Sequence, residues 1–568
     1  MKRLLSVLLV LIASTLIVYA QQWPDTVGLN QYQKMIRNAY NAVDAHNWSE
    51  AIAQWDYLTQ LNPVNGESFY KLGESYFNSG NFDKAISAFK KSLKTGDPAP
   101  FESDYFIARC YAKLHDKTGA LNWLQQSFDL GYRNLAGIQR DSSFKEYFSD
   151  NRFKKIVGMP KSEFKNREEG WRFDLALMVR EVKRRAPKPF RYTSESKFDS
   201  TVEALNKKIP GLTDLQLIIE FEKILVLVGD GHTMIYAFYE RPEFQKNLPV
   251  DFHLFEEGLF ITESDKRYQD LLGSQVIAFD SKTTEEVIKG IDPIINRDNE
   301  IGPKILGLMR MRTTPLLFGL GLVKSPDEVT LTVKYQNGNI KKVNVKADCP
   351  VSARKLWDQL PDSWLTYYQH AKKEPPLYRQ SLFSHYWYQY FKSSATVYFQ
   401  YNRMSNDAQN SFYHFCDSLF AFINANDVDK LIIDMRWNNG GNTLLAPYLL
   451  GKLIACTKIN QKGKLFGIIG GRSYSATINL LGYLERLTPI IFIGEPTGSS
   501  PNFIGEDNPF ELPYSKLIAN VSDLFWQNSW PLDYRKWFAP FMYIPATFKD
   551  YAQCKDPTLD VILNYKKD

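Results

Sequence analysis

The N-terminal part of the chain repeats a pattern of aromatic and small residues with a period of 34 to 35 residues. The recurring positions are Trp48, Ala51 and Trp55, then Phe82, Ala85 and Phe89, and then Ala120. A fixed period of this size is typical of a helix pair that cannot bury its apolar face alone and therefore stacks on its neighbours. The pattern predicts that this segment folds as a stack of helix pairs.

Glycine and aromatic residues also mark the turns between the predicted helices of the repeat. Gly73 and Tyr76, followed by Gly80-Asn81-Phe82, complete a helix–turn–helix unit. Over residues 28–135 the sequence resembles the tetratricopeptide repeat family. The resemblance implies that the concave face binds a peptide or a protein partner. The alternative is that the repeats serve as a spacer or a packing surface for the next domain.

The first twenty residues have the pattern of an export signal. Lys2 and Arg3 precede an apolar run over residues 4–18, and Val18-Tyr19-Ala20 offers small residues where a signal peptidase cuts. We expect cleavage after Ala20 and an exported protein, periplasmic or extracellular, with no membrane span after cleavage. The alternative is an uncleaved membrane anchor, because the run is close to the minimum length for a span.

Composition excludes several classes of function. The 568 residues carry a net charge of only +6 and 44% hydrophobic residues, a globular balance that does not suggest nucleic-acid binding or disorder. The seven histidines show no metal-ligand spacing, so neither a metal nor another cofactor is expected. The five cysteines are an odd number without CxxC spacing, which leaves at least one thiol without a partner in the chain.

Beyond the signal peptide and a repeat domain over residues 21–135, the sequence predicts four segments. They are a helical linker over 136–170, a helical part of a second domain over 171–248, a β-rich region over 249–350 and an α/β core over 351–568. Asn337-Gly338 in the β-rich region predicts a hairpin, and residues 272–287 resemble the peptide-binding part of a PDZ-like module. In the core, strands alternate with helices, which favours a buried sheet.

Two segments of the core carry candidate chemistry. Residues 431–442 (LIIDMRWNNGGN) form a buried strand and a glycine turn, where backbone N–H groups can approach a ligand closely. Residues 471–476 (GRSYSA) lead from a strand into a helix at Ser475. A serine there is commonly an N-cap, but a helix N-terminus also offers free N–H groups to an oxyanion. A nucleophilic serine at this place would have part of its oxyanion hole built in.

Five segments in order resemble landmarks of the carboxyl-terminal processing family of serine peptidases, which includes the tail-specific proteases and the tricorn core. They are GDGHT (229–233), DMRWNNGG (434–441), GRSYSA (471–476), GEPTGSSPN (494–502) and DYRKWFAP (533–540). The resemblance runs from Trp171 to the C-terminus. It implies a multidomain protein, in which the α-helical repeat solenoid precedes an α+β and α/β serine peptidase domain. That domain would have a mixed sheet, crotonase-like βαβ layering and a β-rich PDZ-like insert.

The resemblance assigns roles by position. Ser475 becomes the nucleophile, and the N–H groups of Gly441 and Ala476 become the oxyanion hole. The tail-specific branch has a lysine base where this chain has Ser500, so a Ser–Lys dyad is not expected. The tricorn-like branch instead uses a histidine, here His232, whose neutral imidazole can take a hydroxyl proton near neutral pH.

A further acid is needed to fix the tautomer of the imidazole. The resemblance favours Asp533, with Glu495 as a second candidate, whereas Asp230 is expected to cap the turn before His232.

The chain departs from the family pattern at three positions, Ile478, Asn439 and Gly231. Three functions therefore stay open. The first is an exported serine peptidase that hydrolyses peptide bonds of proteins or peptides. The second is a catalytically silent protein that binds peptides or small hydrophobic ligands, with the aromatic residues of 357–391 as its pocket. The third is an envelope scaffold that acts through its repeats.

Overall fold

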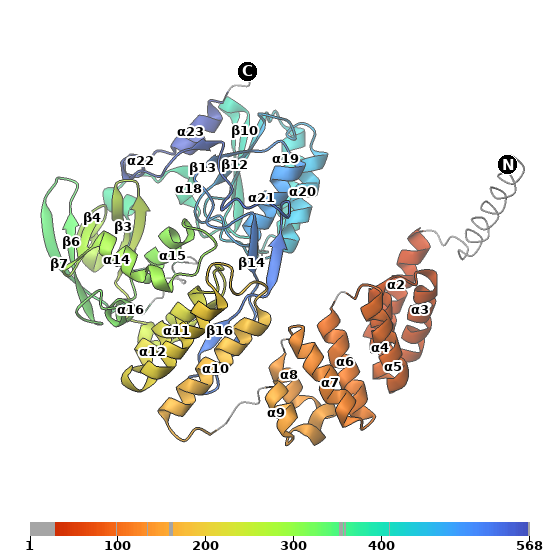
Figure 1. The fold of residues 1–568 in the computed structure, drawn as a ribbon. Coiled ribbons are helices and arrows are strands. Elements are labelled where there is room, and N and C mark those ends of the chain that lie inside the picture. Colours follow the sequence, from red (N-terminus) through yellow and green to blue (C-terminus); the bar gives the residue numbers. More distant parts are fainter. Residues whose placement is uncertain are drawn as a thin grey trace, which may run out of the picture. The chain divides into compact units, whose positions relative to one another are not determined.

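The structure, a computed structural model, describes residues 29–97, 99–132, 134–157, 163–350, 356, 359–407 and 409–565. The expected signal peptide lies outside the described residues. The chain divides into two compact units, Met1–Lys161 and Ser162–Asp568 (Figure 1). In the described part of the chain, no helix combines the length and the apolar character needed to cross a membrane.

The first unit consists of stacked helices, as the period predicts. Its elements are α2 (Leu29–Asp44), α3 (Trp48–Leu61), α4 (Gly66–Asn78), α5 (Phe82–Lys94), α6 (Pro100–Lys113), α7 (Lys117–Asp129), α8 (Leu135–Arg140), η1 (Ser142–Tyr147) and α9 (Asn151–Val157). Ala51, Trp55, Ala85 and Phe89 are all buried. A Cβ at Gly73 would come within 2.9 Å of the Phe89 ring, so the glycine permits the close approach of α4 and α5.

The helices that follow the repeats belong to the same unit. Phe144 of η1 and Phe153 of α9 are fully buried and share a core with Leu124 and Phe128 of α7. These short elements cover much of the segment that the sequence predicted as a linker, and they close the end of the helical stack.

The second unit begins with three helices, α10 (Arg167–Arg185), α11 (Glu195–Lys208) and α12 (Asp214–Val226). A capping box starts α12, because Thr213 and Gln216 each accept a hydrogen bond from the other's backbone N–H. After α12 the chain turns through residues 227–233 into the short strand β1 (Met234–Ile235). Glu222 of α12 accepts a hydrogen bond from the N–H of Ile235. The helix thereby fixes the start of the segment that follows His232.

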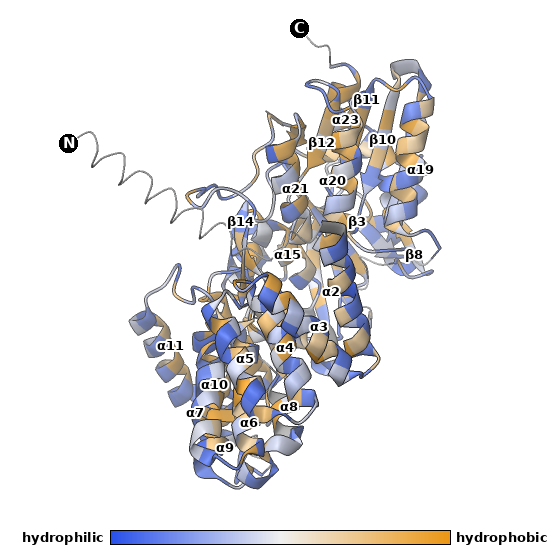
Figure 2. Cartoon of the chain, turned by 90° about the vertical axis from the view of Figure 1, so that its right-hand side faces the viewer, coloured by the Kyte–Doolittle hydropathy of each residue, from blue (hydrophilic) through white to orange (hydrophobic). Residues whose placement is uncertain are grey.

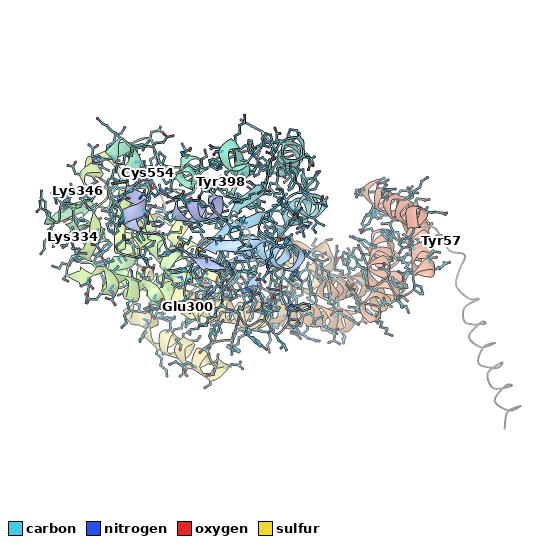
Figure 3. The ribbon with its side chains drawn as sticks, turned by 90° about the horizontal axis from the view of Figure 1, so that it is seen from above. Tyr57, Glu300, Lys334, Lys346, Tyr398 and Cys554 are labelled. Atoms are coloured by element: carbon cyan, nitrogen blue, oxygen red, sulfur yellow. The ribbon has the colours of Figure 1, made fainter. Side chains whose placement is uncertain are left out.

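The β-rich region forms an antiparallel sheet in the order β2-β3-β4-β6-β7. Its strands are β2 (Val250–Phe255), β3 (Gly258–Asp265), β4 (Gln275–Phe279), β6 (Glu328–Lys334) and β7 (Ile340–Lys346). Two short strands pair with interior strands of this sheet: β5 (Lys282–Thr283) with β4, and β8 (Trp364–Thr366) with β3. The Asn337-Gly338 hairpin joins β6 and β7 as predicted, with Gly338 at φ +86°. Lys334 and Lys346 mark this hairpin at the outer margin of the unit (Figure 3). Helices α14 (Thr284–Ile291), α15 (Gly302–Arg310) and α16 (Thr314–Gly319) lie between β5 and β6 in the chain.

The core sheet has six strands in the order β18-β13-β12-β11-β10-β9. They are β9 (Tyr386–Phe391), β10 (Thr396–Tyr401), β11 (Lys430–Asp434), β12 (Leu465–Ile469), β13 (Ile491–Gly494) and β18 (Met542–Tyr543). All neighbours are parallel except β9, which runs antiparallel to β10. The sheet is therefore mixed, as the family resemblance implied.

Helices cover both faces of this sheet. Phe399 and Ile433 pack with α19 (Phe412–Ala425), α20 (Ala446–Ala455) and α21 (Ala476–Leu487). Tyr398 and Ile432, which point to the other face, pack with α23 (Pro557–Leu563). Hydrophobic colour runs along β10, β11 and β12 in Figure 2, as expected of parallel strands covered on both sides. Because β11 and β12 are parallel neighbours, the two candidate turns that follow them leave the sheet at the same edge.

Candidate active site

Ser475 lies in the sharp turn between β12 and α21 and has a strained backbone. Its φ of +52° and ψ of −125° are unusual for a residue with a side chain and cost on the order of 1–3 kcal/mol. Neighbouring hydrogen bonds maintain the turn: the Ser473 hydroxyl donates to the Met435 carbonyl at 2.8 Å, and the Tyr474 N–H donates to the Asn438 carbonyl. Ser475 does not cap the helix with its side chain. Its hydroxyl is therefore available to another group.

That group is the imidazole of His232. The Nε2 atom of His232 lies 3.1 Å from Oγ of Ser475, within hydrogen-bond distance. The two residues are 243 positions apart in the chain. The structure thus brings together the two side chains to which the family resemblance gave the roles of nucleophile and base.

The turn that carries His232 is built around Asp230. One carboxylate oxygen of Asp230 accepts the backbone N–H groups of His232 and Thr233 at 2.8 and 2.6 Å, and the other accepts the Thr233 hydroxyl. This is the capping role that the sequence predicted. Asn520 adds a hydrogen bond to the carbonyl of His232 at 2.8 Å.

Two aromatic rings hold the plane of the imidazole. The ring of Tyr474 lies 5.2 Å from it and that of Phe503 lies 5.9 Å from it, each inclined by 23°. Within the described part of the chain, the buried Nδ1 atom of His232 has no hydrogen-bond partner. Stacking thus orients the ring, and no carboxylate is bonded to Nδ1.

The glycine turn after β11 lies directly against Ser475. Gly440 has φ +104°, and a Cβ there would come 2.7 Å from Cβ of Ser475 and 2.8 Å from the backbone nitrogen of Ala476. The N–H of Gly440 donates to Oδ1 of Asn438. Among the residues that the structure describes, those of Gly441 and Ala476 have no acceptor. Two unused donors therefore flank the serine, at a helix N-terminus that favours negative charge.

Ser475 and His232 open onto a cavity of about 740 Å³. Its apolar lining comes from Met234, Ile305, Leu306, Met309, Phe503 and Trp526. A second cavity of about 1120 Å³ shares Asn439, Gly440, Gly441 and Arg472 with the first. The glycine turn therefore separates two spaces, which together offer room for an extended chain on either side of Ser475.

Neither acid suggested by the resemblance is hydrogen-bonded to His232. The carboxylate of Asp533 accepts hydrogen bonds from Ser529 and from Arg535, which lowers the pKa of Asp533 to about 2. Glu495 accepts the N–H of Ala546 and lines a different cavity of about 430 Å³. Burial raises the pKa of Glu495. Both side chains are thus engaged away from the imidazole.

A different acid, Asp298, lies beside the histidine turn. One of its carboxylate oxygens accepts the N–H of Gly231 at 3.1 Å, and the other accepts the hydroxyl of Ser499. Burial is the largest influence on Asp298 and raises its pKa. Sequence reasoning missed this residue, because it lies within the β-rich region, between α14 and α15, and belongs to no recognisable motif.

The three departures from the family pattern have structural explanations. Ile478 is fully buried in the core on the first turn of α21, where a glutamate would be desolvated. Asn439 is exposed and lines both active-site cavities. Gly231 has no room for a side chain, because its Cβ would lie 1.5 Å from the hydroxyl oxygen of Tyr474. At the position of the missing lysine, Ser500 donates to the carbonyl of Lys536.

No group of three or more His, Cys, Asp or Glu side chains within the described ranges could hold a metal ion. All five cysteines are free thiols, and four of them are buried.

Comparison with known proteins gave one match to a family model and several similar solved structures. Residues 36–103 and 70–127 match the tetratricopeptide repeat family, which confirms the repeat prediction. No curated protein matches the sequence.

The similar structures fall into two groups. Mature CPAF in complex with lactacystin is 11% identical, with 70% of this chain and 97% of that chain covered and a TM-score of 0.49. The photosystem II D1 C-terminal processing protease is 11% identical, with 66% and 93% covered and a TM-score of 0.34. The Yersinia enterocolitica type III secretion chaperone SycD with a peptide of the translocator YopD is 16% identical over 24% of this chain and 95% of that chain, with a TM-score of 0.18.

Proposed function

We propose that this protein is an exported serine peptidase that hydrolyses peptide bonds of proteins or peptides. One observation carries the proposal: the His232 imidazole is within hydrogen-bond distance of the Ser475 hydroxyl, next to two backbone donors that have no acceptor among the described residues. A serine that only capped its helix would need none of these arrangements.

The chemistry follows from the positions of these groups. Nε2 of His232 takes the proton as Oγ of Ser475 attacks the scissile carbonyl, and the new oxyanion accepts hydrogen bonds from Gly441 and Ala476. His232 then gives the proton to the leaving amine, which departs as the acyl-enzyme forms. In the second half, His232 deprotonates a water molecule that attacks the ester and then returns the proton to Oγ as the ester bond breaks, which releases the carboxylic acid and free Ser475. The strained backbone of Ser475 holds Oγ toward the cavity throughout.

The two cavities support a polypeptide as substrate. They meet at the glycine turn, so a chain bound in extended form would place its scissile bond over Ser475. The apolar lining beside His232 suits a hydrophobic side chain. The repeats of the first unit would bind the substrate polypeptide or a protein partner, and export would follow from the N-terminal signal.

The silent ligand-binding alternative has less support. The aromatic side chains suggested as its pocket are largely packed in cores: Trp364, Tyr367 and Tyr368 are at most 5% exposed. Trp387 and Tyr388 lie on β9 and pack on opposite faces of the core sheet. Trp364 and Tyr368 line the cavity of about 1120 Å³, but Trp387 and Tyr388 pack in the cores on either side of the sheet, so the five side chains do not form one common pocket.

Labelling with a fluorophosphonate probe tests the proposal, because the probe reacts only with an activated serine. The full-length protein should be labelled, and Ser475→Ala should not. His232→Gln should react at least about hundred-fold more slowly, since the base is lost. Ser200→Ala, which changes an exposed serine on α11, is the matched control and should react like the wild type.

Turnover of an unfolded protein such as casein, measured with the same variants, separates the first two functions. Casein cleavage that Ser475→Ala abolishes supports the peptidase. A folded wild type that neither reacts with the probe nor cleaves casein contradicts it, and casein binding that survives Ser475→Ala would favour the silent alternative.

A further inference from the structure

The imidazole of His232 lacks the hydrogen-bonded acid that such a base commonly has, but two buried carboxylates flank its turn. Asp230 is used completely by the turn itself, with three hydrogen bonds from His232 and Thr233. Asp298 comes from a distant segment and is 4% exposed. It reaches the turn through a single bond, from the N–H of Gly231.

Gly231 makes this approach possible. A Cβ at position 231 would lie 3.2 Å from Oδ2 of Asp298, in addition to its clash with Tyr474. Any side chain here would push the carboxylate away from the residue that precedes His232. Gly231, which departs from the tricorn pattern, therefore leaves space for the carboxylate of Asp298 from a distant segment of the chain.

Asp298 is also coupled to the imidazole by charge. A charged His232 lowers the pKa of Asp298, as do the Ser499 hydroxyl, the Gly231 N–H and the cation of Arg191. A negative Asp298 would in turn attract the positive charge that the imidazole acquires when it takes the proton of Ser475. Burial reduces the screening of the two charges but also raises the pKa of Asp298, so the hydrogen bonds from Ser499 and Gly231 are needed to favour the negative carboxylate.

We propose that Asp298 is the positioning acid of His232, which fixes the histidine turn through Gly231 and stabilises the imidazolium that forms when Ser475 loses its proton. The inference rests on the proposed function and deepens it, because it replaces Asp533 and Glu495 in the role that the family resemblance gave them. Asp298 acts without touching Nδ1. Ser499 holds the carboxylate from its other side.

Several other charged and polar groups lie close to Asp298 and His232 and also act on the charges of these two residues. Asp298 faces His232 and Asp230 from the turn, Ser499 from the loop after β13, and Arg191 from the segment after α10. Glu506 and Asp507 also line the cavity onto which His232 opens. Of these acids, only Asp298 belongs to a distant segment and accepts a hydrogen bond from the backbone of the histidine turn.

The test measures the pKa of His232 by NMR in the full-length protein, in a Ser475→Ala background that prevents self-cleavage. Loss of the His232 signal in His232→Gln assigns it. Asp298→Asn keeps the size of the side chain and removes its charge, and it should lower the measured pKa of His232. Asp533→Asn is the matched control and should leave that pKa unchanged.

The outcomes are decisive in both directions. An unchanged pKa in Asp298→Asn, or an equal or larger fall in Asp533→Asn, overturns the inference. If Asp298→Asn does not fold, Ser499→Ala takes its place. Without the Ser499 hydroxyl the carboxylate of Asp298 is easier to protonate, so the pKa of His232 should fall, but by less than in Asp298→Asn. An unchanged pKa of His232 in Ser499→Ala counts against the inference.

Probe labelling separates this inference from the proposed function. With Ser475 intact, Asp298→Asn should react roughly ten-fold more slowly near neutral pH, and its pH profile should shift with the pKa of His232. A wild type that is not labelled refutes the peptidase, whereas the NMR result stands without any turnover.

Discussion

Replacing Gly231 by alanine is the sharpest test of how the fold supports the candidate site. The new Cβ would lie 1.5 Å from the hydroxyl oxygen of Tyr474 and 2.8 Å from Cζ of its ring. Ordinary contact needs about 3.5 Å, so Tyr474 or the turn must shift by roughly 2 Å. Tyr474 both stacks on His232 and precedes Ser475, so such a shift would separate the base from the nucleophile. Displacements of about 1 Å can cost on the order of hundred-fold in rate, and we expect at least that loss of probe labelling.

A second substitution isolates the cause. In Gly231→Ala combined with Tyr474→Phe, the hydroxyl is gone and the nearest ring carbon is 2.8 Å away, so a shift of about 0.7 Å suffices. The double variant should therefore label at least about ten-fold faster than Gly231→Ala alone. Gly451→Ala is the matched control, because nothing lies within 4 Å of its Cβ and helix α20 gains stability. Full labelling of folded Gly231→Ala, or no recovery in the double variant, would refute the steric argument.

Two further predictions follow from the same structure. Gly440→Ala should reduce labelling at least about hundred-fold in a folded protein, since its Cβ would lie 2.7 Å from that of Ser475 and its φ of +104° suits only glycine; labelling close to the wild-type rate would contradict the placement of this turn. Asp104 is buried in α6, and burial raises its pKa to about 6. Because the folded state disfavours the charged carboxylate, the free energy of unfolding of the wild type should fall as the pH rises from about 4 through 6. At pH 7.5 Asp104→Asn should therefore have a free energy of unfolding higher by up to about 3 kcal/mol, measured by urea unfolding. Near pH 4 this difference from the wild type should vanish. An equal difference at both pH values would show that charge is not the cause.

Much of the candidate site could be anticipated because its parts are local. A glycine pair after a buried strand and a serine before a helix are patterns of a few residues, and each occurs where the sequence placed it. Their meeting was also foreseeable, since turns after neighbouring parallel strands leave a sheet at one edge. The proximity of His232 to Ser475 was a prediction from resemblance, because no local rule joins residues 243 positions apart.

The acid beside the histidine could not be read in this way. Asp533 was favoured because it lies in a matching segment, yet its side chain is bound by Arg535 and Ser529. Asp298 lies in a stretch of the β-rich region without a motif, and only the packing of that stretch against the turn after α12 brings it to Gly231. Which carboxylate lies next to the imidazole depends on the three-dimensional positions of several loops, and these positions cannot be derived from the spacing of residues in the sequence.

The sequence by itself determined the elements whose causes lie within a few turns of chain: the stacked repeat helices, the capping box of α12, the hairpin at Gly338 and the buried parallel strands. These follow from hydrophobic periodicity and from residues with special backbone preferences. Tertiary structure alone decided which donors stay unused beside Ser475, which rings hold His232 and which acid acts on it. Those outcomes depend on contacts between distant segments, where a shift of one ångström changes the partner.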